Sequence, residues 1–321
     1  MIVSPSLQTN DDARPLFPLC IVIVNWNTRA LLRACLESIY VTVATQPLQV
    51  IVVDNASTDG SAQFVRAHYP AVQVIANAEN VGFARANNQA LAHAHAEFIL
   101  LLNSDAQLEP ETADGLVRAL KQETNAAAVA PRLLNPNRSF QAGPNDALGL
   151  ISELLLTFGL ARFLRGGYFP GYDARAPRGQ YAWVGGTCML LRGATIQQIG
   201  RLDADYFMYT EEADWCWRAR QAGWEIWYEP ALAAIHHGGG SSRHDAGRMR
   251  AELYKSKLLF FSKHRPRWEY ETLRAALMLT ALVKENAYRL AARLSEARAQ
   301  QYIERAISFR QVFQIARSGA A

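Results

Sequence analysis

The sequence has few cysteines, four among 321 residues, and no two of them form a CxxC pair. Cys20 and Cys35 lie in apolar segments, a position typical of a small buried hydrophobic side chain. Cys188 and Cys216 are far from them and from each other along the chain. We therefore expect neither a disulfide framework nor a zinc site, and this cysteine usage favours a reducing, cytoplasmic compartment.

Long apolar runs are also missing, because no stretch approaches the ~18 residues that a membrane-spanning helix needs. The closest candidate, Ala275 to Val283, is much shorter. The N-terminal segment is polar, as at Gln8 to Asp12, and lacks the charged-then-apolar pattern of a signal peptide. We therefore expect no signal peptide and no transmembrane segment.

Three motifs that mark large enzyme classes do not occur in the sequence. The absence of GxxxxGK[ST] argues against a P-loop enzyme, and the absence of GxGxxG argues against a dinucleotide-binding dehydrogenase. No GxSxG nucleophile elbow is present either, which argues against the hydrolases that depend on it.

The net charge of +4 conceals an uneven distribution along the chain. From Arg243 to the end there are 16 Lys and Arg residues against 7 Asp and Glu, whereas the preceding part has 17 against 22. A basic tail on a mildly acidic body suggests contact with an anionic surface, either a membrane or a nucleic acid. A basic helical region that is simply solvated is the competing interpretation.

The first half of the sequence alternates short apolar runs with amphipathic segments. The apolar runs lie at 20–24, 50–53, 72–76 and 98–102. Each of the first three precedes a segment with helical character, such as the one that contains Leu31, Leu32, Cys35, Leu36 and Ile39. This alternation predicts parallel βαβ units, and a further helix begins near Pro110.

The second half is less regular. Residues 126–130 predict another strand, and we interpret 131–180 as an insertion of loops and a helix that crosses the active face. The later predicted elements are a strand within 181–191, helices at 195–199 and 211–222, and strands at 224–228 and 231–235. We predict a lead-in at 1–18, a main α/β domain at 19–242, and a helical extension at 243–321 with one long helix from about Glu269 to Arg298.

Several polar residues come directly after predicted strands, where ligands bind in α/β sheets. Asp54 follows the second strand, Asp105 the fourth and His236 the last. Carboxylate oxygen and imidazole suit Mg²⁺ or Mn²⁺, so Asp105 and His236 form a candidate metal site. The residue pattern alone equally fits a capping aspartate and a hydrogen-bonded histidine.

Glu211, Glu212 and Asp214 place three carboxylates in the first turn of a predicted helix. They fit charge pairing with the helix dipole, but crowded carboxylates also raise one another's pKa, which suits a general base. The run from Gly238 to Ser242 is rich in backbone N–H groups that suit phosphate, although such a run is also typical of a linker.

Five segments, in order, give the sequence a clear resemblance to the family 2 glycosyltransferases of GT-A fold, and within them to the bacterial rhamnosyltransferase-like branch. The resemblance implies a mixed, mainly parallel sheet flanked by helices, with a C-terminal helical extension. The segments are Ile23–Asn27, Val53–Ser61, Asn80–Asn88, Leu101–Asp105, and a discontinuous one that runs from Val184–Gly186 through Phe207–Cys216 to His236–Ser241.

The resemblance also implies roles for individual residues. Glu212 occupies the position of the catalytic base, with Glu211 and Asp214 as less favoured candidates. Asp105 and His236 match the metal ligands. The nucleotide-binding positions are Asn25, Asn27, Asp54, Asn55, Gly82 and Asn103. The sugar and acceptor positions are Trp183, Gly185, Gly186 and Trp215.

This sequence departs from the family pattern at two positions. Ser104 stands where the family usually has Pro in Asn-Pro-Asp, which we interpret as a minor loop change. Glu212 stands where the base is usually Asp, one methylene shorter, which puts the identity of the base in doubt.

The function implied is an inverting, metal-dependent transfer of L-rhamnose from dTDP-rhamnose to a surface polysaccharide or a lipid-linked glycan. Transferases that use UDP- or GDP-linked sugars, and a non-catalytic nucleotide-sugar-binding relative, are the alternatives. A sugar nucleotidyltransferase is disfavoured, because no Gly/Arg/Lys-rich loop follows Val24. We expect no nucleic-acid partner, and the basic tail either contacts the inner face of the plasma membrane or mediates oligomerisation.

Overall fold

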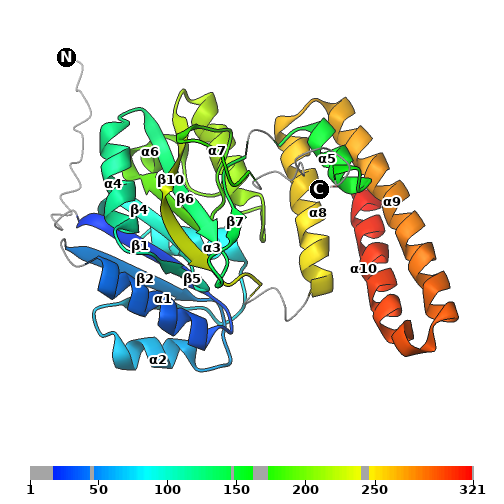
Figure 1. Cartoon of the computed structure of the whole chain (residues 1–321), viewed down its shortest axis with the longest axis horizontal. Coiled ribbons are helices and arrows are strands. Elements are labelled where there is room, and N and C mark those ends of the chain that lie inside the picture. The colour runs from blue at the N-terminus through cyan, green and yellow to red at the C-terminus, as the bar shows by residue number, and fades with distance from the viewer. Residues whose placement is uncertain (1–16, 44–46, 146–147, 162–172, 240–245, 320–321) are drawn as a thin grey trace, which may run out of the picture.

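The computed structural model describes residues 17–43, 47–145, 148–161, 173–239 and 246–319 (Figure 1). Most of the predicted lead-in at 1–18 lies outside these residues, as do the end of the glycine-rich run at 240–242 and part of the predicted insertion, at 162–172. Residues 17 and 18 already belong to the first strand.

The first half of the chain forms four parallel strands in the order β3-β2-β1-β4. In the pairing register Asn25 lies opposite Asp54, and Val24 opposite Asn103, so these strands end at nearly the same level of the sheet. The elements are β1 (Phe17–Asn25), α1 (Arg29–Thr42), β2 (Leu48–Asp54), α2 (Ser61–His68), β3 (Gln73–Ala76), α3 (Phe83–Leu91) and β4 (Ala96–Asn103).

The second half completes a mixed sheet in the order β3-β2-β1-β4-β9-β6-β10-β5, in which β9 runs antiparallel to both of its neighbours. The expected mixed, mainly parallel sheet is therefore confirmed. The elements are β5 (Ala106–Leu108), α4 (Thr112–Gln122), β6 (Ala126–Leu134), β7 (Phe140–Ala142), α5 (Leu150–Thr157), β8 (Gly179–Gln180), β9 (Cys188–Arg192), α6 (Gly193–Ile199), α7 (Glu211–Gln221) and β10 (Glu225–His236).

The strands predicted at 224–228 and 231–235 form one strand, β10, and this part of the prediction was wrong. Its pairing with β6 is irregular between Glu229 and Ala233. Pro230 lies inside that irregularity, and a proline has no N–H to donate to a neighbouring strand. The proline therefore interrupts the hydrogen-bonding pattern without ending the strand.

Apolar side chains cover both faces of the sheet, because alternate residues of each strand point to opposite faces. Leu19, Ile21 and Ile23 pack in one cluster with residues of α1, α2 and α4. Cys20 and Val22 pack in the other, with residues of α3, α7, α8, α9 and α10. All four cysteines are buried and free, which confirms the burial predicted for Cys20 and Cys35.

The C-terminal part consists of helices that project from the sheet (Figure 1). They are α8 (Ala246–His264), α9 (Arg267–Leu294), the 3₁₀ turn η3 (Glu296–Arg298) and α10 (Ala299–Ser318). The long helix predicted to reach Arg298 ends at Leu294, where Ser295 is extended and α10 folds back along α9. Among the described helices, none is both long enough and apolar enough to cross a membrane.

A buried carboxylate of helix α7 links this helix to helix α8 through a hydrogen bond. Asp214 of α7 accepts hydrogen bonds from His264 of α8 at 2.6 Å and from Arg218 at 2.8 Å. Burial alone would raise the pKa of Asp214, but the His264 bond and the charge of Arg218 outweigh it, so the pKa is lowered from its usual value. Nearby, Lys263 of α8 pairs with Asp205, whose side chain is 66% exposed.

We predict that Asp214→Asn destabilises the protein by about 3 kcal/mol, because it leaves His264 and Arg218 without their buried counter-charge. The matched change Asp205→Asn should cost no more than about 1 kcal/mol, since that ion pair is exposed. Urea unfolding of both variants measures the difference, and equal losses would contradict the prediction.

The same pair of variants gives a pH test. The folded-state pKa of Asp214 is lowered, so its stabilising effect is present above the unfolded-state pKa of about 3.9 and is lost as the pH falls through the folded-state value. The difference in stability between wild type and Asp214→Asn should therefore close under acid conditions.

Candidate functional site

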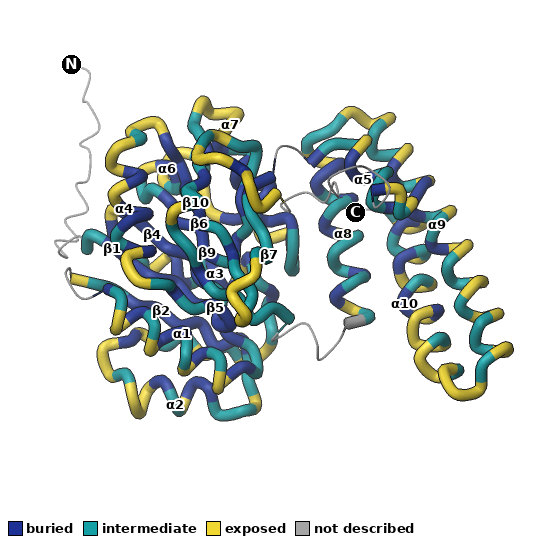
Figure 2. The backbone as a smooth tube through the Cα atoms, viewed as in Figure 1, coloured by how far each residue is buried: buried dark blue, intermediate teal, exposed yellow. Residues whose placement is uncertain are grey.

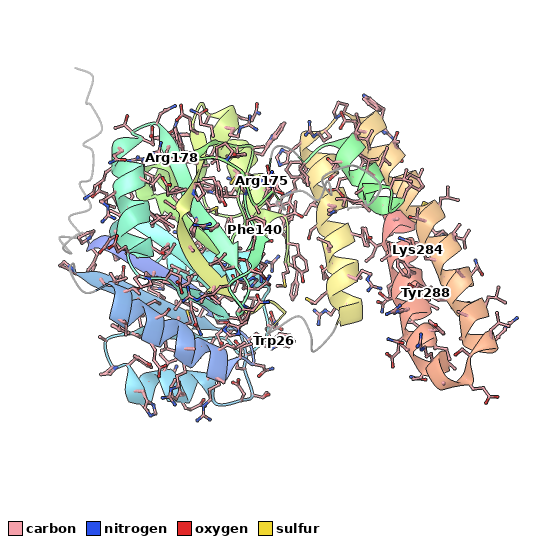
Figure 3. The ribbon with its side chains drawn as sticks, viewed as in Figure 1. Trp26, Phe140, Arg175, Arg178, Lys284 and Tyr288 are labelled. Carbon is pink, nitrogen blue, oxygen red and sulfur yellow. The ribbon has the colours of Figure 1, made fainter. Side chains whose placement is uncertain are left out.

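A pocket of about 250 Å³, here called the main pocket, opens where strands β1, β2 and β4 end. Trp26, which follows β1, lines it and lies on the side of the sheet that faces the C-terminal helices (Figure 3). The main pocket brings together nine of the residues predicted from sequence: Asn55, Gly82, Asn103, Asp105, Gly185, Gly186, Glu211, Glu212 and His236.

Two predicted nucleotide-binding residues, Asn25 and Asp54, lie side by side at the ends of β1 and β2. The amide Nδ2 of Asn25 donates to Oδ1 of Asp54 at 3.0 Å and to the hydroxyl of Ser57 at 3.1 Å. Asn27 joins the same loops, since its Oδ1 accepts from the backbone N–H of Thr58 at 2.7 Å. These three residues are together, as the strand ends predicted, but they do not line the main pocket.

Ser104 is part of this polar network, which the sequence did not reveal. The hydroxyl of Thr28 donates to Oδ1 of Asn25 at 2.7 Å, so its oxygen is left to accept from Ser104 at 2.9 Å. Ser104 thus links the end of β4 to the end of β1. The change that we interpreted as minor gives this loop a hydrogen bond that proline could not make.

Asn55 shapes the pocket by holding the loop that contains Gly82. Its Nδ2 donates to Oδ1 of Asn80 at 2.8 Å and to the carbonyl of Gly82 at 3.2 Å. Gly82 has φ +88°, and a Cβ at that position would lie 2.5 Å from the carbonyl oxygen of Phe207. Only glycine fits there, and the loop consequently packs directly against the segment that contains Phe207.

Asp105 and His236, the predicted metal ligands, are adjacent. Nε2 of His236 lies 3.2 Å from Oδ1 of Asp105, and both side chains are largely buried. A carboxylate oxygen and an imidazole nitrogen at this separation suit Mg²⁺ or Mn²⁺. Among the residues that the structure describes, no cluster of three or more His, Cys, Asp or Glu side chains could hold a metal. A cation here would take two protein ligands and complete its shell from a bound substrate or water.

The predicted base, Glu212, lies with Glu211 at the start of α7 in a buried setting. Burial raises the pKa of both carboxyl groups, and in Glu211 the nearby charge of Glu212 raises it further. Backbone N–H groups, including that of Gly186, partly counter the effect of burial on Glu212. Oε2 of each side chain is buried and has no hydrogen-bond partner. Such carboxylates are suited to taking up a proton near neutral pH.

The turn before α7 has an uncommon backbone conformation. Tyr209 and Thr210 have φ values of +71° and +69°, although neither is glycine. Residues in this region of φ/ψ space often occur at functional sites. The turn is supported from the C-terminal helices, because the hydroxyl of Ser256 in α8 donates to the carbonyl of Met208 at 2.8 Å, and Met249 of α8 lines the main pocket.

Two further predicted residues, Trp215 and Asp214, line neither the main pocket nor a cavity beside it. Trp215 is fully buried in the core and donates its indole N–H to the carbonyl of Gly200 at 3.0 Å. Asp214 points to His264 and Arg218 instead of Glu212. The sequence placed both on the correct helix, but the direct catalytic or sugar-binding roles expected for them have no support in this geometry.

A second cavity of about 500 Å³, here called the side pocket, adjoins the main pocket and shares Gly185, Thr187 and His236 with it. Trp183 lines the side pocket together with Asn145, and the two residues pair through their backbones. Gly239 lines the main pocket, whereas the rest of the predicted phosphate-binding run, 240–242, lies outside the described residues.

Known proteins resemble this chain over most of its length. It is 27% identical over 254 residues to an N-acetylglucosaminyl-diphospho-decaprenol L-rhamnosyltransferase of Mycobacterium tuberculosis, which covers 74% of this chain and 82% of that protein. It is 24% identical over 230 residues to the rhamnosyltransferase WbbL of Escherichia coli, which covers 70% and 84%.

A solved structure shows the same fold. The mannosyltransferase PcManGT of Pyrobaculum calidifontis, determined in complex with GDP-Man and Mn²⁺, matches with a TM-score of 0.55 at 17% identity. The match covers 96% of this chain and 89% of that one. This likeness confirms the GT-A fold expected from the sequence.

The family assignment comes from the sequence itself. Residues 20–194, more than half of the chain, match the model of glycosyl transferase family 2. This span includes the polar ends of β1, β2 and β4 and the glycine of the loop at Gly82. The protein belongs to glycosyl transferase family 2.

Proposed function

We propose that this glycosyltransferase transfers L-rhamnose from dTDP-L-rhamnose to a glycan acceptor, with inversion at the anomeric carbon and with a divalent cation. The convergence of Asp105, His236 and the partly buried Glu212 on one pocket carries the proposal. The names of the two bacterial relatives support rhamnose as the sugar, and the name of the Mycobacterium tuberculosis relative supports a lipid-linked acceptor.

In this proposal the nucleotide of the donor lies along the ends of β1, β2 and β4. The carboxylate of Asp54, oriented by the buried amide of Asn25, recognises the edge of the base, and Asn27 with Asn55 keeps the surrounding loops in place. Oδ1 of Asn103 is buried without a hydrogen-bond partner at the edge of the main pocket, which suits an acceptor for a ribose hydroxyl.

Asp105 and His236 would hold the cation. A bound Mg²⁺ or Mn²⁺ supplies positive charge that stabilises the departing nucleoside diphosphate. Both side chains come from strand ends, so the sheet fixes their separation before any ligand arrives.

Glu212 is the proposed general base. It takes the proton of an acceptor hydroxyl while that oxygen forms a bond to the anomeric carbon, and the bond from this carbon to the diphosphate oxygen breaks on the opposite face. Glu212 is favoured over Glu211 because it is partly exposed, whereas Glu211 is buried. Its raised pKa makes it a stronger base than an ordinary glutamate.

The side pocket is the proposed place of the acceptor. It meets the main pocket at Gly185 and His236, close to the proposed sugar position, and Trp183 offers a flat apolar surface there. Gly186 lies against Glu212, since a Cβ on this glycine would be 3.4 Å from that of Glu212. A small residue therefore keeps the path between acceptor and base open.

Two other functions remain candidates. The GDP-mannose complex of the archaeal neighbour favours testing UDP- and GDP-linked donors beside dTDP-rhamnose. Glu212 stands where the family usually has aspartate. The second candidate is therefore a protein that binds nucleotide sugars without turning them over. Calorimetry that detects nucleotide binding without turnover of any donor would support this second candidate.

Contact with a membrane through the C-terminal helices is part of the proposal. Large apolar side chains are exposed on α9, among them Leu290 and Leu294 near its C-terminal end. Figure 2 shows that much of the turn between α9 and α10 is exposed. The excess of Lys and Arg after residue 242 would attract anionic lipid at the inner face of the plasma membrane. A lipid-linked acceptor would be presented at that surface.

With dTDP-rhamnose, an acceptor glycan and Mn²⁺ or Mg²⁺, we expect release of dTDP that EDTA abolishes and added metal restores. His236→Ala should lower this release at least about 100-fold, because it removes a proposed metal ligand. The neighbouring change His237→Ala is the matched control, since this ring contacts Gln107 and does not line the main pocket. Metal-independent turnover would contradict the proposal, and turnover of UDP- or GDP-sugars alone would change the donor.

For the base, we expect Glu212→Gln to lower kcat by about 10²–10⁴-fold and to leave dTDP binding unchanged. Because the base must be deprotonated and its pKa is raised, wild-type kcat/KM should rise with pH through a value above that of an ordinary glutamate. Glu211→Gln should have the smaller effect on kcat. The reverse order of the two variants would assign the base to Glu211.

For the membrane contact, we expect the protein to sediment with vesicles that contain anionic lipid and not with neutral ones. Replacing Leu290 and Leu294 by Ser should weaken this association, since both side chains are exposed and apolar. Sedimentation velocity on the same variants tests the alternative, because loss of an oligomer without loss of vesicle binding would identify the helices as a subunit interface.

A further inference from the structure

The hairpin formed by β6 and β7 holds His236 through one side-chain amide, that of Gln141 in β7. Nδ1 of the His236 ring lies 2.7 Å from Oε1 of Gln141, and Nε2 of Gln141 donates to the backbone carbonyl of His236 at 2.8 Å. The same amide therefore contacts both the ring and the main chain of this histidine. Phe140, which precedes Gln141, is labelled in Figure 3.

Gln141 is itself oriented by Asn135, at the start of the hairpin turn. Nδ2 of Asn135 donates to the carbonyl of Phe140 at 3.2 Å, so its Oδ1 faces Gln141 and accepts from Nε2 of that residue at 3.0 Å. Backbone carbonyl oxygens can only accept hydrogen bonds. The carbonyls of Phe140 and His236 thus fix which end of each amide is the NH₂ group.

This chain of hydrogen bonds decides where the His236 ring carries its proton. Because Oε1 of Gln141 can only accept, the nitrogen that faces it, Nδ1, must be the N–H. In the neutral ring Nε2 then carries a lone pair, and this atom lies 3.2 Å from the carboxylate oxygen of Asp105. Two acceptors that face each other at this distance are stabilised by a cation between them.

We infer that Gln141, oriented by Asn135, is a positioning residue that holds His236 as the Nδ1–H tautomer and directs Nε2 toward the cation shared with Asp105. The inference rests on the proposed function only for the presence of that cation. The hydrogen bond made by the second nitrogen of a metal-bound histidine fixes its ring and tautomer, and loss of such a partner typically weakens metal binding by about 10–100-fold.

The chain offers a matched control in the next residue. His237 also contacts a glutamine, since its Nε2 lies 3.4 Å from Nε2 of Gln107 in β5. Neither residue of this second pair lines the main pocket. Gln107→Leu therefore removes a glutamine beside a histidine on the same strand end without touching the proposed cation site.

The experiment uses the full-length chain with [¹⁵N]histidine and no metal. At a pH where the His236 ring is neutral, we expect its ¹⁵N shifts to show the proton on Nδ1 in wild type and in Gln107→Leu, and a different tautomer distribution in Gln141→Leu. With Mn²⁺ and dTDP as probes, EPR should show about 10–100-fold weaker Mn²⁺ binding to Gln141→Leu only. Asn135→Ala, which frees the Gln141 amide, should have an effect in the same direction.

The result that overturns the inference is a neutral wild-type His236 ring that carries its proton on Nε2 in the metal-free protein, or a Gln141→Leu protein that binds Mn²⁺ as tightly as Gln107→Leu. If wild type shows the expected tautomer but binds no Mn²⁺ with any nucleoside diphosphate, the metal-dependent function fails and the positioning of His236 stands. Should Gln141→Leu fail to fold, Asn135→Ala decides by the same two measurements.

Discussion

The candidate site depends on the antiparallel pairing of β5 with β10. In this pairing Ala106 lies opposite His236, and the N–H of His237 donates to the carbonyl of Asp105 at 3.0 Å. Asp105 and His236 are 131 residues apart in the sequence, yet backbone hydrogen bonds fix their distance. Their side chains are two acceptors with no attraction for each other without a cation or a proton, so the sheet must hold them together.

Sequence patterns predicted the part of the site that local periodicity controls. Apolar runs of four or five residues located β1, β2 and β4, and parallel pairing then brought Asn25, Asp54 and Asn103 to one edge. Residue pattern and family resemblance both pointed to Glu212 and His236, but only the fold shows that the two residues line the same pocket. The positions of the strand ends were predicted correctly because each is set by a short segment of the chain.

The rest could not be predicted, because it depends on contacts between distant segments. β5 spans only Ala106–Leu108, too short for a periodic signal. The break at Ser295 has no glycine or proline to mark it. Helical spacing placed Trp215 on α7 but could not tell which face meets the pocket. The role of Gln141 likewise depends on the β6–β7 hairpin, in a region whose sequence suggested loops.

The C-terminal helices help to form the main pocket. α8 contributes Met249 to its lining and supports the turn at Met208, next to the two glutamates whose pKa values burial raises. The main pocket is therefore not formed by the sheet and its loops alone, because a segment of the basic C-terminal part also contributes to its lining.

The main pocket has two walls that come from different parts of the chain. The wall with Asn103 and Asp105 falls within residues 20–194, the part that the family model matches, whereas Glu212, His236 and Met249 follow it. Substitutions in the later part can therefore alter the proposed base and the histidine of the proposed cation site while the nucleotide wall stays unchanged. Two chains that match the family model equally well over 20–194 can thus differ in the residue that accepts the proton, so the base has to be identified in each chain from the segment that follows the match.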